Sequence, residues 1–174
     1  MNFEQFRYLK THALTIGTDG MPQKKYETTE VRNLSPLVLA YIGDAVFDLF
    51  VRTRLLDFEQ NKVRILHDYD AVIVSATMQS LAFREIEASL TEAEKAIVRR
   101  GRNAKSTVPK SATVRDYRYS TGFEALLGTL YLTKNYSRLE QISEQAFVAI
   151  SRAIAKVAQS AAIEPPTQEK RLPT

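Results

Sequence analysis

Residues 37–51 read LVLAYIGDAVFDLFV, and this stretch decides the fold. Two carboxylates, Asp44 and Asp48, interrupt an otherwise mostly apolar run, and they lie four residues apart. At helical spacing both side chains point the same way. An unpaired buried carboxylate is costly, so at least one of them is expected to have a cation, a hydrogen-bond donor or a metal beside it.

A second stretch repeats the pattern. Residues 119–133 read YSTGFEALLGTLYLT, in which Glu124 is the only charged residue. If the two predicted helices cross in the core, Asp44 and Glu124 meet at one point, where hard oxygen ligands would suit a divalent ion such as Mg²⁺. The alternative for each acid is a buried pair with an arginine. For Asp48 a salt bridge or a supporting role is favoured over direct metal ligation.

The rest of the chain predicts an all-α protein. Ser35 as a cap and Pro36 at the first helical position begin a helix that runs to about Leu56. Helical periodicity resumes at residues 71–82, and Thr91 with Glu94 forms a capping box that opens a short helix. This helix should stop at Gly101, and further helices are expected at about 116–133 and 138–159, after a loop at 103–114.

The predicted domain organisation is simple. Residues 1–33 are an N-terminal extension, with turn signals from Gly17 to Lys25 that indicate a flexible linker, although Phe3, Phe6 and Tyr8 could pack. Residues 34–160 form the helical domain, and 161–174 a disordered tail. No apolar run is long enough for a membrane span, and the N-terminus lacks a secretory pattern, so a cytoplasmic protein is expected.

Composition restricts the chemistry. The 174 residues include no cysteine, which excludes disulfides, thiolate catalysis and cysteine-ligated metals. The net charge is +4, yet residues 99–118 alone hold seven basic residues and one acid. Such a concentration is typical of a surface that contacts a phosphate backbone. Solvation of a helix C-terminus is the other explanation, and composition leaves both open.

The motifs around the two acids resemble a known family. Residues 41–46 (YIGDAV) resemble the ribonuclease III signature, and residues 123–128 (FEALLG) its second acidic motif. The similarity is closer to the short Mini-ribonuclease III branch, which lacks a double-stranded-RNA-binding domain. Three further segments, residues 100–106, 109–110 and 117–121, also resemble the sequence motifs of that branch. The resemblance covers roughly residues 34–150.

This resemblance implies a dimeric, all-α, ribonuclease III-like endonuclease domain. It implies an Mg²⁺-dependent endoribonuclease that cuts double-stranded RNA, matures the ends of the 23S ribosomal RNA precursor, works as a homodimer and has a ribosomal protein as a possible partner. Asp44 and Glu124 would be the catalytic metal ligands. The candidate RNA contacts are Arg100, Arg102, Lys105, Lys110 and Arg118, of which Arg100, Arg102 and Lys105 could instead support the acidic site.

The chain also departs from the larger ribonuclease III enzymes. Leu37 and Ala40 stand where those enzymes have glutamates, and Thr121 stands where they have an aspartate. Mini-ribonuclease III resembles this chain in its reduced set of acids, so the number of metal ions stays open. A non-catalytic RNA-binding ribosome-assembly protein is the alternative, but such a protein would be expected to lose both acids. A purely helical interaction module would not explain why each of two apolar helices carries an isolated acid.

Overall fold

A computed structural model describes residues 4, 7, 11, 15–22 and 30–163. The chain divides into two compact units, Met1–Asn33 and Leu34–Thr174. In the first unit an isolated bridge pairs Ile16 with Pro22, and the 3₁₀ helix η1 spans Val31–Asn33. The predictions for Phe3, Phe6 and Tyr8 and for the tail beyond residue 163 lie outside the described residues.

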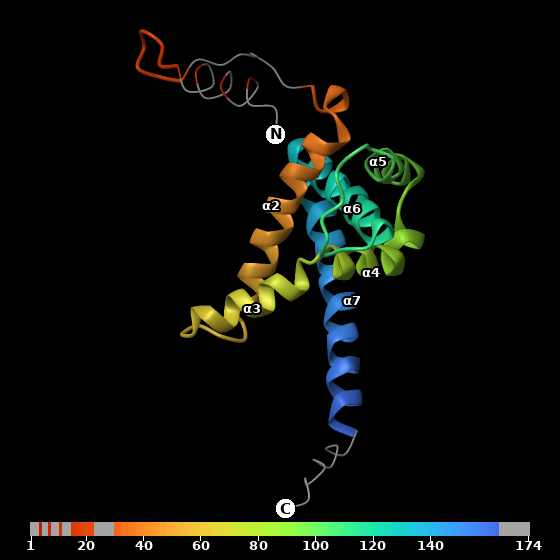
Figure 1. Cartoon of the computed structure of the whole chain (residues 1–174). Coiled ribbons are helices and arrows are strands. Elements are labelled where there is room, and N and C mark those ends of the chain that lie inside the picture. Colours follow the sequence, from red (N-terminus) through yellow and green to blue (C-terminus); the bar gives the residue numbers. More distant parts are fainter. Residues whose placement is uncertain (1–3, 5–6, 8–10, 12–14, 23–29, 164–174) are drawn as a thin grey trace, which may run out of the picture. The chain divides into compact units, whose positions relative to one another are not determined.

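The second unit is helical, and no strand interrupts residues 34–163, which confirms the predicted fold class. Figure 1 shows α6 in the middle of this unit, with the other helices around it. The elements are α2 (Pro36–Leu55), α3 (Val63–Ile73), α4 (Ala76–Ile86), the 3₁₀ helix η2 (Glu87–Ser89), α5 (Glu92–Arg102), α6 (Val114–Leu132) and α7 (Tyr136–Ile163).

The two helix caps predicted at Ser35 and Thr91 are confirmed. The Ser35 hydroxyl accepts a hydrogen bond from the Val38 N–H at 3.3 Å, and Pro36 opens α2. At α5 the capping box is complete, because Thr91 Oγ1 accepts from the Glu94 N–H at 3.2 Å while Glu94 Oε2 accepts from the Thr91 N–H at 2.8 Å. The helix ends at Arg102, one residue beyond Gly101.

The helical periodicity at residues 71–82 spans two helices. The chain leaves α3 after Ile73, and Ser75 takes an extended conformation whose hydroxyl accepts from the Met78 N–H at 3.4 Å. A serine hydroxyl that caps a helix offers the backbone an alternative to a continuous helix. The direction of the chain therefore changes between α3 and α4.

The core forms around α6, with aromatic side chains at its centre. Phe47, Phe83 and Phe123 are fully buried, and the rings of Phe47 and Phe123 meet edge to face at 5.2 Å. A buried ion pair ties α5 to α7, since Arg138 Nε lies 2.7 Å from Glu94 Oε1. The hydrogen bond from Arg138 lowers the pKa of Glu94 to about 2.

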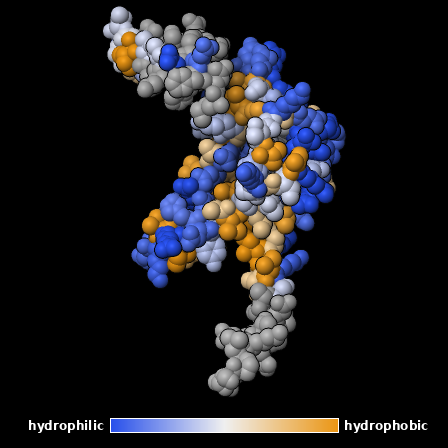
Figure 2. All heavy atoms as spheres, viewed as in Figure 1, coloured by the Kyte–Doolittle hydropathy of each residue, from blue (hydrophilic) through white to orange (hydrophobic). Residues whose placement is uncertain are grey.

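Apolar side chains also remain on the surface. In Figure 2 hydrophilic residues cover α5, while hydrophobic ones show on α3 and along α7. The α2 helix exposes four large apolar side chains, Leu37, Val38, Tyr41 and Leu49. None of the helices in the described part of the chain is both long and apolar enough to span a bilayer.

Candidate functional site

The site is built where α2 and α6 cross with their backbones in contact. A Cβ added at Gly43 would overlap the backbone carbonyl of Glu124, and a Cβ added at Gly128 would overlap the carbonyl of Leu39. Only glycine permits so close an approach of two helices. Because Asp44 follows Gly43 directly and Glu124 supplies the opposing carbonyl, the crossing brings the two predicted acids together.

A second glycine contact holds α5 against α6. A Cβ added at Gly101 would lie 2.7 Å from the Gly122 Cα, and one added at Gly122 would lie 2.9 Å from the carbonyl oxygen of Val98. The end of α5, where the basic segment begins, therefore packs directly on the turn of α6 that precedes Glu124.

Both carboxyl groups have raised pKa values, and Asp44 contributes to the shift of Glu124. Burial, followed by repulsion from Asp44, raises the pKa of Glu124 to about 8. Partial burial of its carboxyl, followed by repulsion from Asp48, raises the pKa of Asp44, although the residue itself reaches the surface. Both groups therefore hold protons more tightly than free carboxylic acids do, and a nearby cation would oppose this effect by stabilising their ionised forms.

Neither acid has a cationic partner in the described part of the chain. No ion pair there involves Asp44 or Glu124, so the arrangement differs from a buried acid neutralised by an arginine. Within the same residues no cluster of three or more histidine, cysteine or acidic side chains could hold a metal ion. Two carboxylates with open surface beside them fit Mg²⁺, which takes one or two protein carboxylates and keeps several waters.

Asp48 is paired with an arginine, as its favoured interpretation predicted. Arg52 Nε lies 3.0 Å from the Asp48 carboxylate, and another nitrogen of Arg52 lies 3.2 Å from Asp70 Oδ2. Burial, then repulsion from Asp48, raises the pKa of Asp70, while Arg52 lowers it. This network joins α2 to α3 one helical turn from Asp44.

The three positions that depart from the larger enzymes contribute no further acid. Thr121 is buried, and its hydroxyl donates to the Tyr117 carbonyl of its own helix at 2.8 Å. Leu37 lies at the surface of α2, and Ala40 lies in the core.

The predicted RNA contacts fall into two groups. Arg100 donates to the Leu34 carbonyl at 3.3 Å, and the guanidinium of Arg102 lies over the Tyr119 ring at 4.2 Å, so both contact their own protein. Lys105, Lys110 and Arg118 are exposed and form no ion pair within the described residues. Of the five predicted RNA contacts, these three side chains are therefore the most accessible to a ligand.

One neighbour of the site was missed by the sequence reasoning. Gln79 on α4 is 1% exposed, its side-chain amide donates to the Val74 carbonyl at 3.0 Å, and it acts against the rise in the pKa of Glu124. Its signal was present in the sequence, because it is a polar residue inside the apolar periodicity of residues 71–82.

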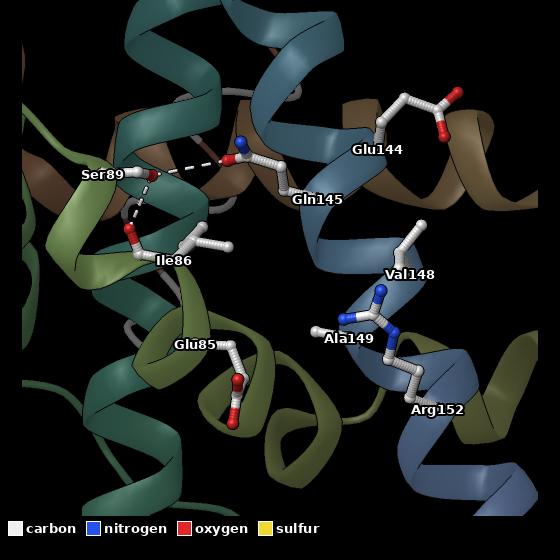
Figure 3. A pocket seen from close by; sticks show the side chains of 8 residues that line it. All are labelled: Glu85, Ile86, Ser89, Glu144, Gln145, Val148, Ala149 and Arg152. Atoms are coloured by element: carbon white, nitrogen blue, oxygen red, sulfur yellow. Dashed lines mark hydrogen bonds between the residues drawn. The ribbon is translucent and has the colours of Figure 1, made fainter.

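A separate pocket of about 400 Å³ lies between the end of α4, η2 and α7. Figure 3 shows Glu85 and Arg152 on its two sides and the Ser89 hydroxyl bonded to the Ile86 carbonyl at 2.8 Å. It contains none of the predicted site residues, so the candidate site remains the α2–α6 crossing.

Comparisons with known proteins identify the family to which the chain is similar. Residues 37–135 match the ribonuclease III domain. The Mini-ribonuclease 3 of a Thermoanaerobacter species is 50% identical over 66% of this chain and 81% of its own length, and that of Symbiobacterium thermophilum is 46% identical over 68% and 92%. A crystal structure of a Fusobacterium nucleatum protein, 36% identical, superposes with a TM-score of 0.61 over 67% of this chain and 94% of the other.

Proposed function

Because this chain belongs to the ribonuclease III family, as an endoribonuclease of the Mini-ribonuclease 3 type, we propose that it hydrolyses double-stranded RNA with a divalent ion held by Asp44 and Glu124. The observation that carries the proposal is the crossing of α2 and α6. There Asp44 lies close enough to Glu124 to raise its pKa, and neither acid has a cationic partner in the described residues.

The protein supplies position and charge in this reaction. Asp44 and Glu124 would hold Mg²⁺, and the carboxyl of Glu124 must lose its proton to do so, because only the ionised form binds a metal well. When bound, Mg²⁺ orients a water, lowers its pKa and neutralises the charge that develops on the phosphate. No protein nucleophile is needed, and Asp48 stays engaged with Arg52.

The substrate proposal rests on the basic segment and on the family motifs. Lys105, Lys110 and Arg118 offer exposed charge for the phosphates of a duplex, and a duplex is recognised largely through its backbone. The resemblance of the motifs to Mini-ribonuclease III supports the ends of the 23S ribosomal RNA precursor as the target, in the cytoplasm.

A homodimer is part of the proposal. Tyr41 is 76% exposed and Leu49 64% exposed on α2, the helix that carries Asp44. A two-fold partner that covers this apolar surface would place one acid pair opposite each strand of an antiparallel duplex.

The direct test is to incubate the purified protein with a long RNA duplex, with Mg²⁺ and with EDTA. We expect defined shorter products only with Mg²⁺, and none with Asp44→Asn or Glu124→Gln, because each change preserves shape and removes the charge that holds the ion. Both variants should bind the duplex with nearly unchanged affinity.

The matched control is Asp57→Asn, which removes an exposed acid just beyond α2 and should leave cleavage unchanged. Near-normal turnover by either site variant at limiting Mg²⁺ would refute the metal assignment. Duplex binding without cleavage by the wild-type protein would favour the non-catalytic ribosome-assembly alternative.

A further inference from the structure

Asp70 on α3 is a buried acid that the proposed reaction does not use. It is 5% exposed, and a guanidinium nitrogen of Arg52 on α2 lies 3.2 Å from its Oδ2 atom. The other carboxyl oxygen, Oδ1, is buried and has no hydrogen-bond partner among the described residues. A buried carboxylate is normally hydrogen-bonded at both oxygens, so this environment is poorly suited to a negative charge.

Arg52 does not serve Asp70 alone. Its Nε atom lies 3.0 Å from the carboxylate of Asp48, so two acids share one guanidinium, and the side chain of Arg52 is 51% exposed. An ion pair with an exposed partner contributes little to stability, whereas an ionised carboxylate in the interior is costly. The balance therefore favours a proton on the more deeply buried acid, which is Asp70.

The charged neighbours of Asp70 agree with this conclusion. From α2, Asp48 opposes its ionisation and Arg52 favours it, and His67 on α3 favours it when protonated. No charged side chain of α4, the other helix that packs against α3, acts on Asp70. Burial has the largest effect, and together with Asp48 it outweighs the two basic groups, so the pKa of Asp70 is raised.

The two ends of α3 are attached differently. Next to its C-terminal end, the Val74 carbonyl accepts a hydrogen bond from Gln79 Nε2 on α4 at 3.0 Å. At its start, Lys62 provides no side-chain cap, and a cavity of about 220 Å³ lies between α2 and α3, with His67 and Asp70 in its lining. A polar cavity of this size has room for water, which can solvate an ionised Asp70 if the start of α3 moves away from α2.

We propose that α3 is a proton-dependent element: a protonated Asp70 docks it against α2, and loss of this proton releases the start of the helix, which pivots at the junction with α4. This inference goes beyond the proposed function and does not depend on it. The competing explanation is an ion-pair clasp, in which an ionised Asp70 holds α3 through Arg52. The two explanations predict opposite responses to pH.

The measurement is hydrogen exchange of the backbone amides of α3, corrected for the intrinsic exchange rate, with the amides of α6 as a reference for opening of the whole domain. In the wild type, the equilibrium constant for opening α3 should rise by up to about tenfold per pH unit above 3.8, the ordinary pKa of an aspartate. The rise should end where Asp70 also ionises in the docked state. Protection of α3 that is constant or increases with pH would overturn the proposal, and an increase would support the ion-pair clasp.

Asp70→Asn separates the two explanations, because it keeps the shape of the side chain and carries no charge at any pH. In this variant α3 should stay docked, with no pH dependence beyond that of α6. The matched control is Asp68→Asn, which removes an exposed acid from the same helix and should keep the wild-type response. Release of α3 at every pH in Asp70→Asn, or an unchanged pH dependence, would refute the role of the proton.

Arg52→Gln tests the same point from α2. An ion-pair clasp would open in this variant, whereas under the proposal α3 stays docked and its release moves to higher pH, because Arg52 favours the ionised form of Asp70. Release of α3 at low pH in Arg52→Gln would contradict the proposal.

A wild-type measurement covers the case in which these variants do not fold. The carbon-13 signal of the Asp70 side-chain carboxyl should titrate with a midpoint above 3.8. A midpoint at or below this value would show that Asp70 is ionised in the docked state, and the proposal would be wrong.

Discussion

Glu124 combines two unfavourable conditions for a charged carboxyl, burial and the nearby Asp44, and these raise its pKa to about 8. The folded protein tolerates a buried Glu124 carboxyl because the protonated group carries no charge. The cost arises when the proton leaves, and a divalent ion would then offset it. Proton loss and metal binding should therefore be linked at this residue.

This linkage predicts that the metal-free protein loses stability as the pH rises. The unfolded chain releases the Glu124 proton near pH 4.5, whereas the folded chain keeps it to about pH 8. The contribution of this group to the free energy of unfolding is therefore full below pH 4.5 and is lost progressively as the pH rises to about 8. One proton gives a slope of up to about 1.4 kcal/mol per pH unit. The raised pKa of Asp44 acts in the same direction.

Urea unfolding in EDTA between these pH values should show the decline for the wild type and a smaller one for Glu124→Gln. Mg²⁺ should restore stability most at the alkaline end. Parallel curves for the two proteins would contradict the assignment of the raised pKa to Glu124.

Single residues also show what the sequence could and could not predict. The spacing of Asp44 and Asp48 and the isolation of Glu124 indicated Asp44 and Glu124 as candidate site residues, because a charge within an apolar helix is visible without coordinates. Gln79 was missed because an amide carries no charge and because its partner, the Val74 carbonyl, is defined only once α3 and α4 are packed.

Among the helices, the contact of α2 with α6 sets the geometry of the site. Because a Cβ at Gly43 would overlap the Glu124 backbone, the separation of the two acids depends on a residue with no side chain. The core around Phe47 and Phe123 then fixes the rotation of each helix.

Gly43→Ala should therefore separate the helices and reduce both stability and cleavage. Overpacking costs about 1–3 kcal/mol and occasionally more; because the backbone carbonyl at this site cannot move aside as a side chain can, we expect the upper end, which exceeds the gain of about 1 kcal/mol that alanine brings in an open helix. Urea unfolding and a duplex cleavage assay should both show the loss, while Thr53→Ala, an exposed change on α2, should show neither. A Gly43→Ala protein with normal cleavage would refute the role of the crossing.

Helix boundaries were predictable where the signal is local. The caps at Ser35 and Thr91 are confirmed because a hydroxyl and the N–H three residues later meet within one turn. The division into α3 and α4 was not foreseen, because apolar spacing continues through it and only the cap at Ser75 marks the change. The glycine crossings could not be foreseen either, since they depend on which helices meet.

The loop after α5 and the start of α6 should carry the salt dependence of RNA binding. Replacing Lys105, Lys110 and Arg118 with alanine, in the inactive Asp44→Asn background, should reduce the slope of log affinity against log salt by up to about 3, one for each phosphate contact. Arg102→Ala, which removes a side chain stacked on Tyr119, should mainly lower stability. An unchanged slope in the triple variant would indicate a structural role for this segment.

For the whole molecule, the exposed apolar surface of α2 remains to be explained by a partner. A chain of 174 residues is long enough to bury a sizeable core, yet Tyr41 and Leu49 stay exposed on the helix that holds Asp44. A second copy would cover them and complete a site for two strands.

Sedimentation equilibrium should therefore report about twice the chain mass of 19.7 kDa. Mixing inactive Asp44→Asn chains with active ones should give nicked duplexes, since a mixed dimer has one working site. Tyr41→Glu should weaken self-association by placing a charge on the covered surface. An active monomer, or double-strand cuts alone from the mixed dimers, would contradict this assembly.

The four glycines at the two helix crossings have a consequence for interpreting related sequences whose activity is untested. A chain can keep both acids and still lose the ability to bring them together, if a bulkier residue stands at the position of Gly43 or Gly128. Such a chain would look intact in a motif search and would be a pseudoenzyme. Small residues at these positions are therefore as informative about retained activity as the carboxylates themselves.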